Sequence, residues 1–475
     1  IYGWRGARIE NIHQFSRDFE GVCTIRLEQN YRSTQNILSA ANKLIGNNQD
    51  RLGKELWSEG DPGELIKVYS GFNDIDEARF IVERSQQWID QGGGPDEIAI
   101  LYRSNAQSRV LEEALLRANI PYRIYGGQRF FDRAEIKNVL AYMRLMQDQD
   151  SDVAFERAVN TPPRGVGDKT LQVVRDIARN TGTSLWEASL KGLEEGILSA
   201  RAGNSIKGFL DLVLAMSAEV ESMALHELAE HCINVSGLMD YHSLEKGERG
   251  LARKENLEEL ISACHQFDGE LVFPIEDSQS SGFSLLQEFL DQVSLDAGDR
   301  QSVDGPCLQM MTLHSAKGLE FPLVFLGGME EGLFPHQMAS DEPGRMEEER
   351  RLAYVGVTRA MKELYLTFAE TRRLHGQDSF NRPSRFLLEI PKELLSEVRL
   401  GGELQRGRST KESLSNSLVD EFGMKMGQRV LHQKYGEGVI MQFEGSGDRA
   451  KIEVNFPHAG SKWLMVAYAN LELLD

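Results

Sequence analysis

Long apolar runs are missing from this sequence, and its cysteines are few and scattered. No stretch of about 18 apolar residues occurs, so we expect no membrane-spanning helix, and the start shows no signal peptide. The four cysteines (Cys23, Cys232, Cys264 and Cys307) have spacings that fit neither a metal site nor a disulfide framework. We therefore expect a cytoplasmic protein without a bound metal of its own.

Two elements of nucleotide hydrolysis are also missing. The sequence contains no Gly-x-x-x-x-Gly-Lys-Ser/Thr motif, the loop that cradles the phosphates of a nucleotide. It also offers no strand-terminal Asp-Glu pair for Mg²⁺. Because phosphoryl transfer needs positioned phosphates, a metal ion and an oriented water, we expect this chain alone to be inactive as an ATPase.

Positive charge is in short supply. The chain has 53 Lys and Arg residues against 73 Asp and Glu residues, for a net charge of −20 at pH 7. Such a balance argues against binding a polyanion over the whole surface. A nucleic-acid contact would need a local basic or aromatic track within an acidic body.

An arginine-containing helix is the most informative stretch that is present. Residues 347–360 have helical spacing, and Arg351, Val355 and Arg359 recur at i, i+4 and i+8, so we expect them to share one face. Glu347 lies at the right spacing to pair with Arg351. Arg359 has Glu363 four residues on, so an ordinary surface pair and a functional arginine both remain open.

A second informative stretch reads as strand, polar loop and buried strand. It runs from Met310 to Leu326, and its loop contains His314, Gly318 and Glu320. Polar groups between buried strands lie at a sheet end, where α/β folds bind ligands. Near the start, Tyr31 and Arg32 also stand at the end of a predicted strand, Thr24–Leu27.

Alternating strands and helices predict an α/β fold with a parallel sheet covered on both faces. We expect strands at 66–69 and 98–102 and a helix at 33–46 with Ser33 as its N-cap. Residues 126–306 read as mainly helical, and their acidic segment 265–306 reads as a mobile connection back to the sheet. The sheet domain is then discontinuous, 25–125 plus 307–400.

The C-terminal part reads as a linker and a small barrel. Residues 401–425 are rich in Arg, Gly, Ser, Asn and Lys, which is typical of a linker. Residues 426–475 contain predicted strands at 429–431, 439–443, 451–456 and 463–466. The sequence Tyr-Gly-Glu-Gly at 435–438 predicts the first tight turn.

Three further clusters are candidate nucleic-acid contacts, each with a structural alternative. Tyr2, Trp4 and Arg5 lie among glycines, either as a packed aromatic corner or as a base-stacking site. Arg103 and Asn105 follow a strand end, where Ser104 or Asn105 could simply cap a helix. The turn at Gly165 and Gly167 leads into a helix that contains Thr170, an arrangement that presents N–H groups to a phosphate, although Asp168 fits an ordinary helix start.

Taken together, these motifs resemble motifs III to VI of superfamily 1A DNA helicases of the UvrD, PcrA and Rep type. The resemblance covers the whole chain and implies a second RecA-like domain (25–125 plus 307–400), an inserted helical domain (126–306) and a Tudor-like barrel (426–475). Residues 1–24 would be the remnant of an N-terminal RecA-like domain. Because the chain begins at Ile1 within a motif, we expect it to be part of a longer protein.

The resemblance also implies roles for individual residues. Arg359 would be the arginine finger, Arg32 a second γ-phosphate contact, Tyr31 an adenine stack and Glu320 a ribose contact. ATP and Mg²⁺ would be held mainly by the absent N-terminal domain. His314 would link nucleotide and DNA, and the residues expected to contact DNA would be Tyr2, Trp4, Arg5, Arg103, Asn105, His314, Gly165, Gly167, Thr170 and Phe386, the last of which fits a core position better.

The function implied is ATP-driven 3′→5′ translocation on single-stranded DNA and duplex unwinding in nucleotide-excision and mismatch repair. Partners would be single-stranded and duplex DNA, with RNA polymerase and repair proteins contacted through residues 426–475, and no membrane. The alternative is a non-catalytic module that binds DNA or RNA polymerase. A plain spacer barrel is the alternative for residues 426–475.

Overall fold

The structure is a computed structural model of the 475-residue chain. It describes residues 10–19, 21–49, 53–270, 282–298, 305–340, 344–374, 377–398, 428–432, 436–444, 451–456, 460–465, 469 and 471–474. The chain forms two compact units, Ile1–Leu400 and Gly401–Asp475. Tyr2, Trp4 and Arg5 lie outside the described residues, as does the predicted linker 401–425.

The first unit is built on a seven-stranded sheet in which all neighbouring strands are parallel. The order across the sheet is β3-β4-β2-β5-β6-β1-β9. Every residue of β2 is buried, as expected for a central strand covered on both faces. The strands are β1 (Ile66–Gly71), β2 (Ile98–Tyr102), β3 (Tyr122–Ile124), β4 (Leu308–Thr312), β5 (Phe321–Leu326), β6 (Ala360–Ala369) and β9 (Leu395–Glu397).

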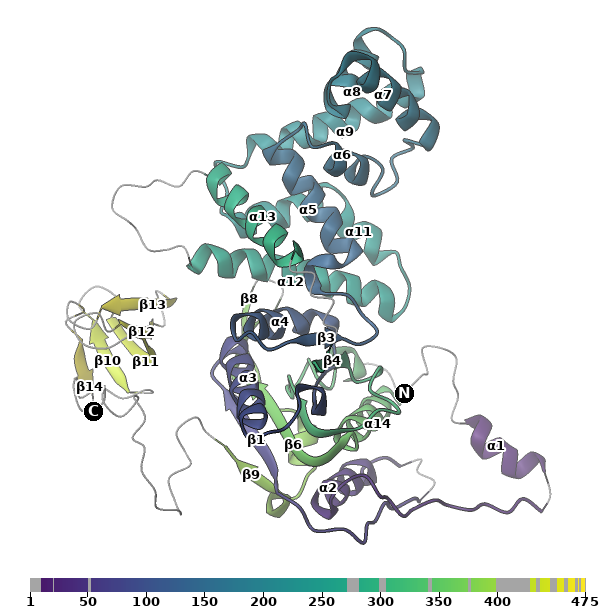
Figure 1. The fold of residues 1–475 in the computed structure, drawn as a ribbon, viewed down its shortest axis with the longest axis vertical. Coiled ribbons are helices and arrows are strands. Elements are labelled where there is room, and N and C mark those ends of the chain that lie inside the picture. The colour runs from purple at the N-terminus through teal and green to yellow at the C-terminus, as the bar shows by residue number, and fades with distance from the viewer. Residues whose placement is uncertain are drawn as a thin grey trace. The chain divides into compact units, whose positions relative to one another are not determined.

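Helices cover both faces of the sheet (Figure 1). Successive strand residues point to opposite faces, so Ala99 and Leu101 pack in one cluster with α2, α14 and α15. Ile98 and Ile100 pack in the other cluster with α3 and α4. These helices are α2 (Gln35–Gly46), α3 (Asp74–Asp90), α4 (Ser108–Arg117), α14 (Arg345–Val357) and α15 (Arg385–Leu388).

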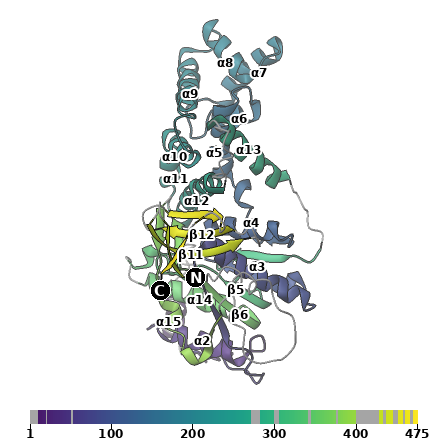
Figure 2. The ribbon, with the colours of Figure 1, turned by 90° about the vertical axis from the view of Figure 1, so that its left-hand side faces the viewer.

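Between β3 and β4 the chain forms a helical body with a core of its own. Figures 1 and 2 show these helices, α5 to α13, as a group separate from the sheet. Val139, Met143 and Met146 are buried in this core, as their helical spacing predicts. The helices are α5 (Ala134–Gln147), α6 (Asp152–Ala158), α7 (Asp168–Thr181), α8 (Leu185–Glu194), α9 (Ala200–Ala218), α10 (Leu225–Val235), α11 (Leu238–Ser243), α12 (Glu248–Glu270) and α13 (Gly282–Gly298).

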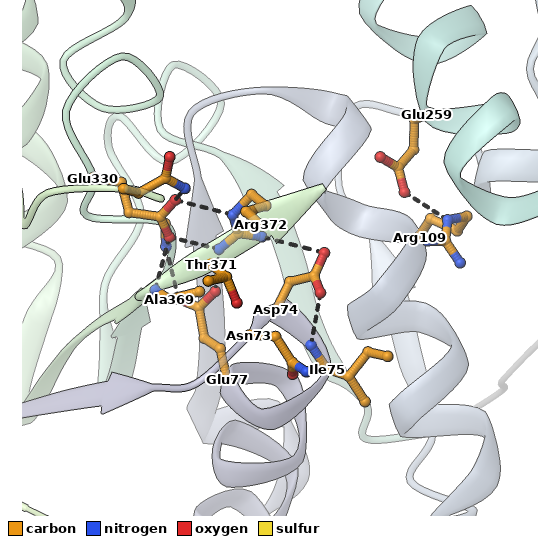
Figure 3. Close-up of polar contacts among 12 residues, drawn as sticks. Asn73, Asp74, Ile75, Glu77, Arg109, Glu259, Glu330, Ala369, Thr371 and Arg372 are labelled. Carbon is orange, nitrogen blue, oxygen red and sulfur yellow. Dashed lines mark hydrogen bonds and ion pairs between the residues drawn. The ribbon is translucent and has the colours of Figure 1, made fainter. Parts of the chain in front are cut away.

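Polar contacts join α12 to the sheet region. Arg109 of α4 donates from Nε to Glu259 Oε1 at 2.6 Å (Figure 3). Arg133, just before α5, donates from Nη1 to Asn256 Oδ1 at 2.7 Å. A junction made of charged and amide groups resembles the interfaces between domains of one chain more than a domain core.

A buried carboxylate, Glu112 of α4, lies where the chain leaves the sheet for the helical body. Its Oε1 accepts from Ser108 Oγ at 2.6 Å and from the backbone N–H of Phe130 at 3.3 Å. Arg133 Nη2 lies 3.9 Å from the same oxygen. Burial raises the pKa of Glu112 to about 7, because it outweighs the opposing attraction of Arg133.

We expect Glu112→Gln to reduce the pH dependence of folding stability. In the wild type the folded carboxyl has a pKa of about 7, against the ordinary value of 4.5 for a glutamate carboxyl. The folded state therefore binds more protons, and its stability is fully present below pH 4.5 and is lost as pH rises through 7. The loss is at most about 3 kcal/mol. Urea unfolding of both proteins at acid and neutral pH measures it, and equal pH dependences would contradict the assignment.

The remaining elements of the first unit are short. An antiparallel hairpin, β7 (Thr371–Leu374) and β8 (Gln377–Phe380), follows β6 and forms a separate two-stranded sheet. Helix α1 (Glu10–Asp18) precedes the sheet domain. The 3₁₀ helices are Pro95–Glu97, Asn105–Gln107, Phe130–Asp132, Gln337–Ser340 and Lys392–Leu394.

The second unit is an antiparallel sheet of order β13-β12-β11-β10-β14. Val430, Ile440, Ile452 and Val454 form its buried core. The fifth strand, β14, was not predicted. The strands are β10 (Arg429–His432), β11 (Gly436–Glu444), β12 (Lys451–Phe456), β13 (Gly460–Met465) and β14 (Glu472–Leu474).

The predicted fold class is confirmed, and several local predictions are wrong. The α/β architecture, helical insertion and small C-terminal sheet are all present. Residues 24–27 form no strand. Gly436 and Gly438 lie within β11, so the prediction that they belong to a tight turn is wrong. Segment 265–306 contains the end of α12 and all of α13, whose apolar residues at helical spacing bury in the core.

Candidate functional site

Arg32 is fixed at the start of β6 by local hydrogen bonds. Asn30 Oδ1 accepts the backbone N–H groups of Arg32 and Ser33, at 2.8 and 3.0 Å. Ser33 Oγ donates to the carbonyl of Ala360 at 2.6 Å. Helix α2 begins at Gln35, so its N-cap is Thr34, whose side chain makes no capping hydrogen bond, rather than the predicted Ser33. These bonds place the Arg32 guanidinium beside the strand that follows Arg359.

Glu320 faces Arg32. The Arg32 Nε lies 2.5 Å from Glu320 Oε2, and Arg32 Nη1 donates to the Thr358 carbonyl at 3.4 Å. The Glu320 side chain is 50% exposed, so its ion pair with Arg32 faces solvent. An exposed pair of this kind contributes about 0–1 kcal/mol, which leaves both side chains able to exchange partners for a ligand.

Arg359 is buried but has no carboxylate partner among the described residues. Its guanidinium donates to Val355 O at 3.0 Å, Leu319 O at 2.8 Å and Thr358 Oγ1 at 3.1 Å. Burial, and then the nearby charge of Arg32, lower the pKa of Arg359 to about 10. Two neighbouring guanidiniums, one of them without an ion pair to any described residue, make a site suited to a phosphate.

The structure does not contain the ordinary surface ion pair between Arg359 and Glu363 that the sequence left open. Glu363, four residues on, instead accepts from Lys67 Nζ at 3.3 Å. The prediction that Arg359 shares a helix face with Arg351 and Val355 is also wrong, because α14 ends at Val357 and Arg359 lies in the turn that follows. Arg351 remains on α14 and pairs with Glu347 at 3.0 Å, as predicted.

Glu320 and Arg359 lie at the end of the sheet where the parallel strands begin, which is opposite to the end that we expected from the sequence. Glu320 immediately precedes β5 and Arg359 immediately precedes β6, so both lie where parallel strands begin. We expected ligand groups where the strands end. His314 is half-buried and follows the end of β4, on that other edge, and the loop 313–320 runs from one edge to the other.

Tyr31 is strongly exposed beside Arg32. Its side chain is 86% exposed, and its hydroxyl donates to Gln29 Oε1 at 2.8 Å. An exposed aromatic ring next to paired guanidiniums can stack on a base whose phosphates the guanidiniums bind. The structure therefore brings together four residues singled out from the sequence, Tyr31, Arg32, Glu320 and Arg359.

One of the two predicted DNA contacts at this strand end, Arg103, is paired with carboxylates of the protein. Arg103 Nη2 lies 2.9 Å from Glu349 Oε1 and 3.5 Å from Glu248 Oε1. Ser104 caps the next short helix, as the structural alternative proposed. Asn105 is half-buried and its carbonyl accepts from Arg133. Arg103 is therefore a structural cation here rather than an exposed contact for a DNA backbone.

Phe386 is a core residue. It has no exposed surface, and its ring lies 5.3 Å from that of Phe334, centroid to centroid. Helix α15, which carries it, packs against the same sheet face as α14. A base contact from Phe386 is corrected to a packing role, because the ring would have to leave the core to reach a ligand.

The glycine turn before α7 remains open for a ligand. Gly165 has φ +79°, which favours glycine, and a Cβ built on Gly167 would meet nothing within 4 Å. Gly167 precedes the first helical residue, Asp168, and Thr170 donates its N–H to Gly167 O at 2.9 Å. The exposed helix start fits a phosphate, although the Asp168 carboxylate opposes one.

Over the described ranges, no cluster of His, Cys, Asp and Glu is arranged to hold a metal ion. None of the helices in those ranges is long and apolar enough to cross a membrane. The sequence missed one residue of this site, Thr358, which contacts both guanidiniums. Its position directly before Arg359 was the available signal.

Comparison with known proteins gives matches over nearly the whole chain. Residues 25–371 match the model described as UvrD-like helicase C-terminal domain, and residues 426–472 match that of the PcrA/UvrD tudor domain. DNA helicase II of Escherichia coli is 54% identical over 473 residues, which cover 99% of this chain. DNA helicase II of Salmonella typhimurium is 53% identical over 473 residues, again 99% of this chain.

The match to a more distant relative also covers 99% of this chain. The ATP-dependent DNA helicase PcrA of Bacillus subtilis is 39% identical over 487 residues and covers 99% of this chain. The chain spans only 65% of the length of each of these three relatives. About a third of each relative therefore has no counterpart in the sequence described here.

Proposed function

The chain belongs to the family of UvrD-like helicase C-terminal domains, and on that premise we propose that it is the C-terminal part of an ATP-dependent DNA helicase. The resemblance found in the sequence is confirmed by the match over residues 25–371. The observation that carries the proposal is the pair Arg32 and Arg359, a two-guanidinium site in which Arg359 has no carboxylate partner among the described residues.

We propose that this pair forms one wall of an ATP pocket. Arg359 would act as the arginine finger and Arg32 as a second γ-phosphate contact, because a guanidinium fork binds phosphate oxygens bidentately. Glu320 would leave its ion pair with Arg32 and contact the ribose instead. Tyr31 would stack on the adenine. ATP, when bound with Mg²⁺, supplies the phosphoryl group that water attacks.

The opposing wall must come from another lobe. The sequence has no phosphate-binding loop, and the described residues contain no carboxylate cluster for Mg²⁺. The residues present fit the phosphates of ATP and do not fit the metal. We therefore propose that Mg²⁺ and the β-phosphate are held by the part of the longer protein that this chain does not include.

We also propose the remaining features of such a helicase for the longer protein. Residues 25–125 plus 307–400 would act as the second RecA-like domain, and 126–306 as an inserted domain whose turn at Gly165 and Gly167 meets duplex DNA. Translocation would be 3′→5′ on single-stranded DNA, in nucleotide-excision and mismatch repair. Residues 426–475 would contact RNA polymerase or repair proteins.

Comparing the chain with the longer protein tests the proposal. Purified residues 1–475 should show no measurable ATP hydrolysis and only weak single-strand binding, whereas the full-length helicase, the longer protein implied here, should hydrolyse ATP when DNA is added. DNA-stimulated hydrolysis by the chain alone would contradict the two-lobe pocket. A full-length protein without hydrolysis would favour the alternative, a non-catalytic module that binds DNA or RNA polymerase.

A further inference from the structure

Thr358 contacts both guanidiniums of the candidate site. Its hydroxyl accepts from Arg359 Nη2 at 3.1 Å, and its carbonyl accepts from Arg32 Nη1 at 3.4 Å. Thr358 is only 3% exposed, so water has little access to its hydroxyl and its carbonyl. A single buried residue thus joins side chains that come from distant parts of the sequence.

The orientation of the Thr358 hydroxyl is fixed by the end of α14. The hydroxyl oxygen lies 2.9 Å from Tyr354 O and 3.0 Å from Val355 O, and it can donate only its one proton to these carbonyls. A hydroxyl committed in this way turns a lone pair outward. Arg359 Nη2 is the donor that uses this lone pair.

The contacts of Arg359 leave part of its fork available. A guanidinium has five N–H donors, and the described residues use one on Nε, one on Nη1 and one on Nη2. One N–H therefore remains on each terminal nitrogen, the pattern needed for two oxygens of one phosphate. Without the Thr358 hydroxyl, Nη2 would lose its only contact with a described residue, and the guanidinium could rotate away.

We propose that Thr358 is a positioning residue for phosphate binding, which orients the Arg359 fork through its hydroxyl and holds Arg32 through its carbonyl. This inference rests on the proposed function, because it assigns Thr358 a part in the same pocket. Thr358 itself touches no reacting atom. Its effect on turnover should therefore pass entirely through the arginines.

The test removes the hydroxyl while keeping the side-chain shape. In the full-length helicase, Thr358→Val should lower kcat for DNA-stimulated ATP hydrolysis about 10- to 100-fold, the range for a lost hydrogen bond to a charged group. The KM for ATP should change by less than about threefold, since the finger acts mainly in the transition state. Thr358→Ser keeps the hydroxyl and should restore kcat to near the wild-type value.

A matched control separates positioning from packing. The buried hydroxyl of Thr34 has no hydrogen-bond partner among the described residues, so Thr34→Val removes a comparable group nearby and should leave kcat unchanged. Combining Thr358→Val with Arg359→Ala should lower kcat no further than Arg359→Ala alone, because a positioning residue has nothing left to orient.

The outcomes distinguish this inference from the proposed function. If Arg359→Ala abolishes turnover while Thr358→Val keeps wild-type kcat, the positioning role is wrong and the pocket stands. If Thr358→Ser is as slow as Thr358→Val, the hydroxyl is not responsible and the inference also fails. If Arg359→Ala itself hydrolyses ATP normally, the proposed function fails with it.

Discussion

Replacing Arg359 by alanine in the full-length helicase should lower DNA-stimulated ATP turnover by about 10³–10⁵-fold, the contribution of an arginine finger in other nucleotide hydrolases. The reason lies in its surroundings. Three oxygens of the protein hold the guanidinium, and no described carboxylate forms an ion pair with it, so its charge is available to the phosphate in the transition state. Steady-state ATP hydrolysis with saturating single-stranded DNA measures the effect.

Arg351→Ala is the matched control for this prediction. Arg351 lies two turns earlier, on α14, and forms a partly exposed i,i+4 pair with Glu347. Removing it should leave turnover within about threefold of wild type, because such a pair contributes about 0.5 kcal/mol to the helix. Loss of turnover in both variants would point to damage to α14, and retained turnover in Arg359→Ala would refute the finger assignment.

Replacing Arg372 by methionine should destabilise the sheet domain by about 3–5 kcal/mol, the usual effect of breaking a buried ion pair. Arg372, in β7, donates from Nε to Glu330 Oε2 at 3.1 Å and from Nη2 to Glu77 Oε2 at 2.5 Å (Figure 3). Glu330 is 0% and Glu77 5% exposed, so methionine would leave both carboxylates buried without their cation. Urea unfolding of residues 1–475 measures the loss.

An exposed pair in the same domain supplies the control. Arg385 lies 2.7 Å from Glu331, but its side chain is 45% exposed, so Arg385→Met should change stability by less than about 1 kcal/mol. Adding Glu77→Gln and Glu330→Gln to Arg372→Met should recover part of the loss, because it removes the uncompensated charges. Equal effects of the two arginine substitutions would contradict the role given to burial.

The strands were the most predictable part of the fold. The buried parallel strand 98–102 is a continuous apolar run, and the antiparallel strand 451–456 alternates polar and apolar residues, so both could be delimited from the sequence to the residue. The segment 24–27 has the same apolar character, yet Ile25 and Leu27 are 81% and 79% exposed. Local pattern could not reveal that no described strand of this chain pairs with it.

The polar contacts were much less predictable. Arg103 stands at a strand end, as a DNA contact would, but Glu349 and Glu248 lie far along the sequence and neutralise it. The same holds for Arg372, whose partner Glu77 comes from a distant helix. Distance along the chain hides such pairs from any local reading. Arg32 and Arg359 were found only because their motifs matched a family as well as a spacing.

A structure of the full-length helicase with single-stranded DNA, Mg²⁺ and a non-hydrolysable ATP analogue tests the central claim most directly. We expect the γ-phosphate within hydrogen-bond distance of both Arg32 and Arg359, with Glu320 released from Arg32. An analogue bound elsewhere, while Arg32 stays paired with Glu320 and Arg359 contacts only its present oxygens, would contradict the account.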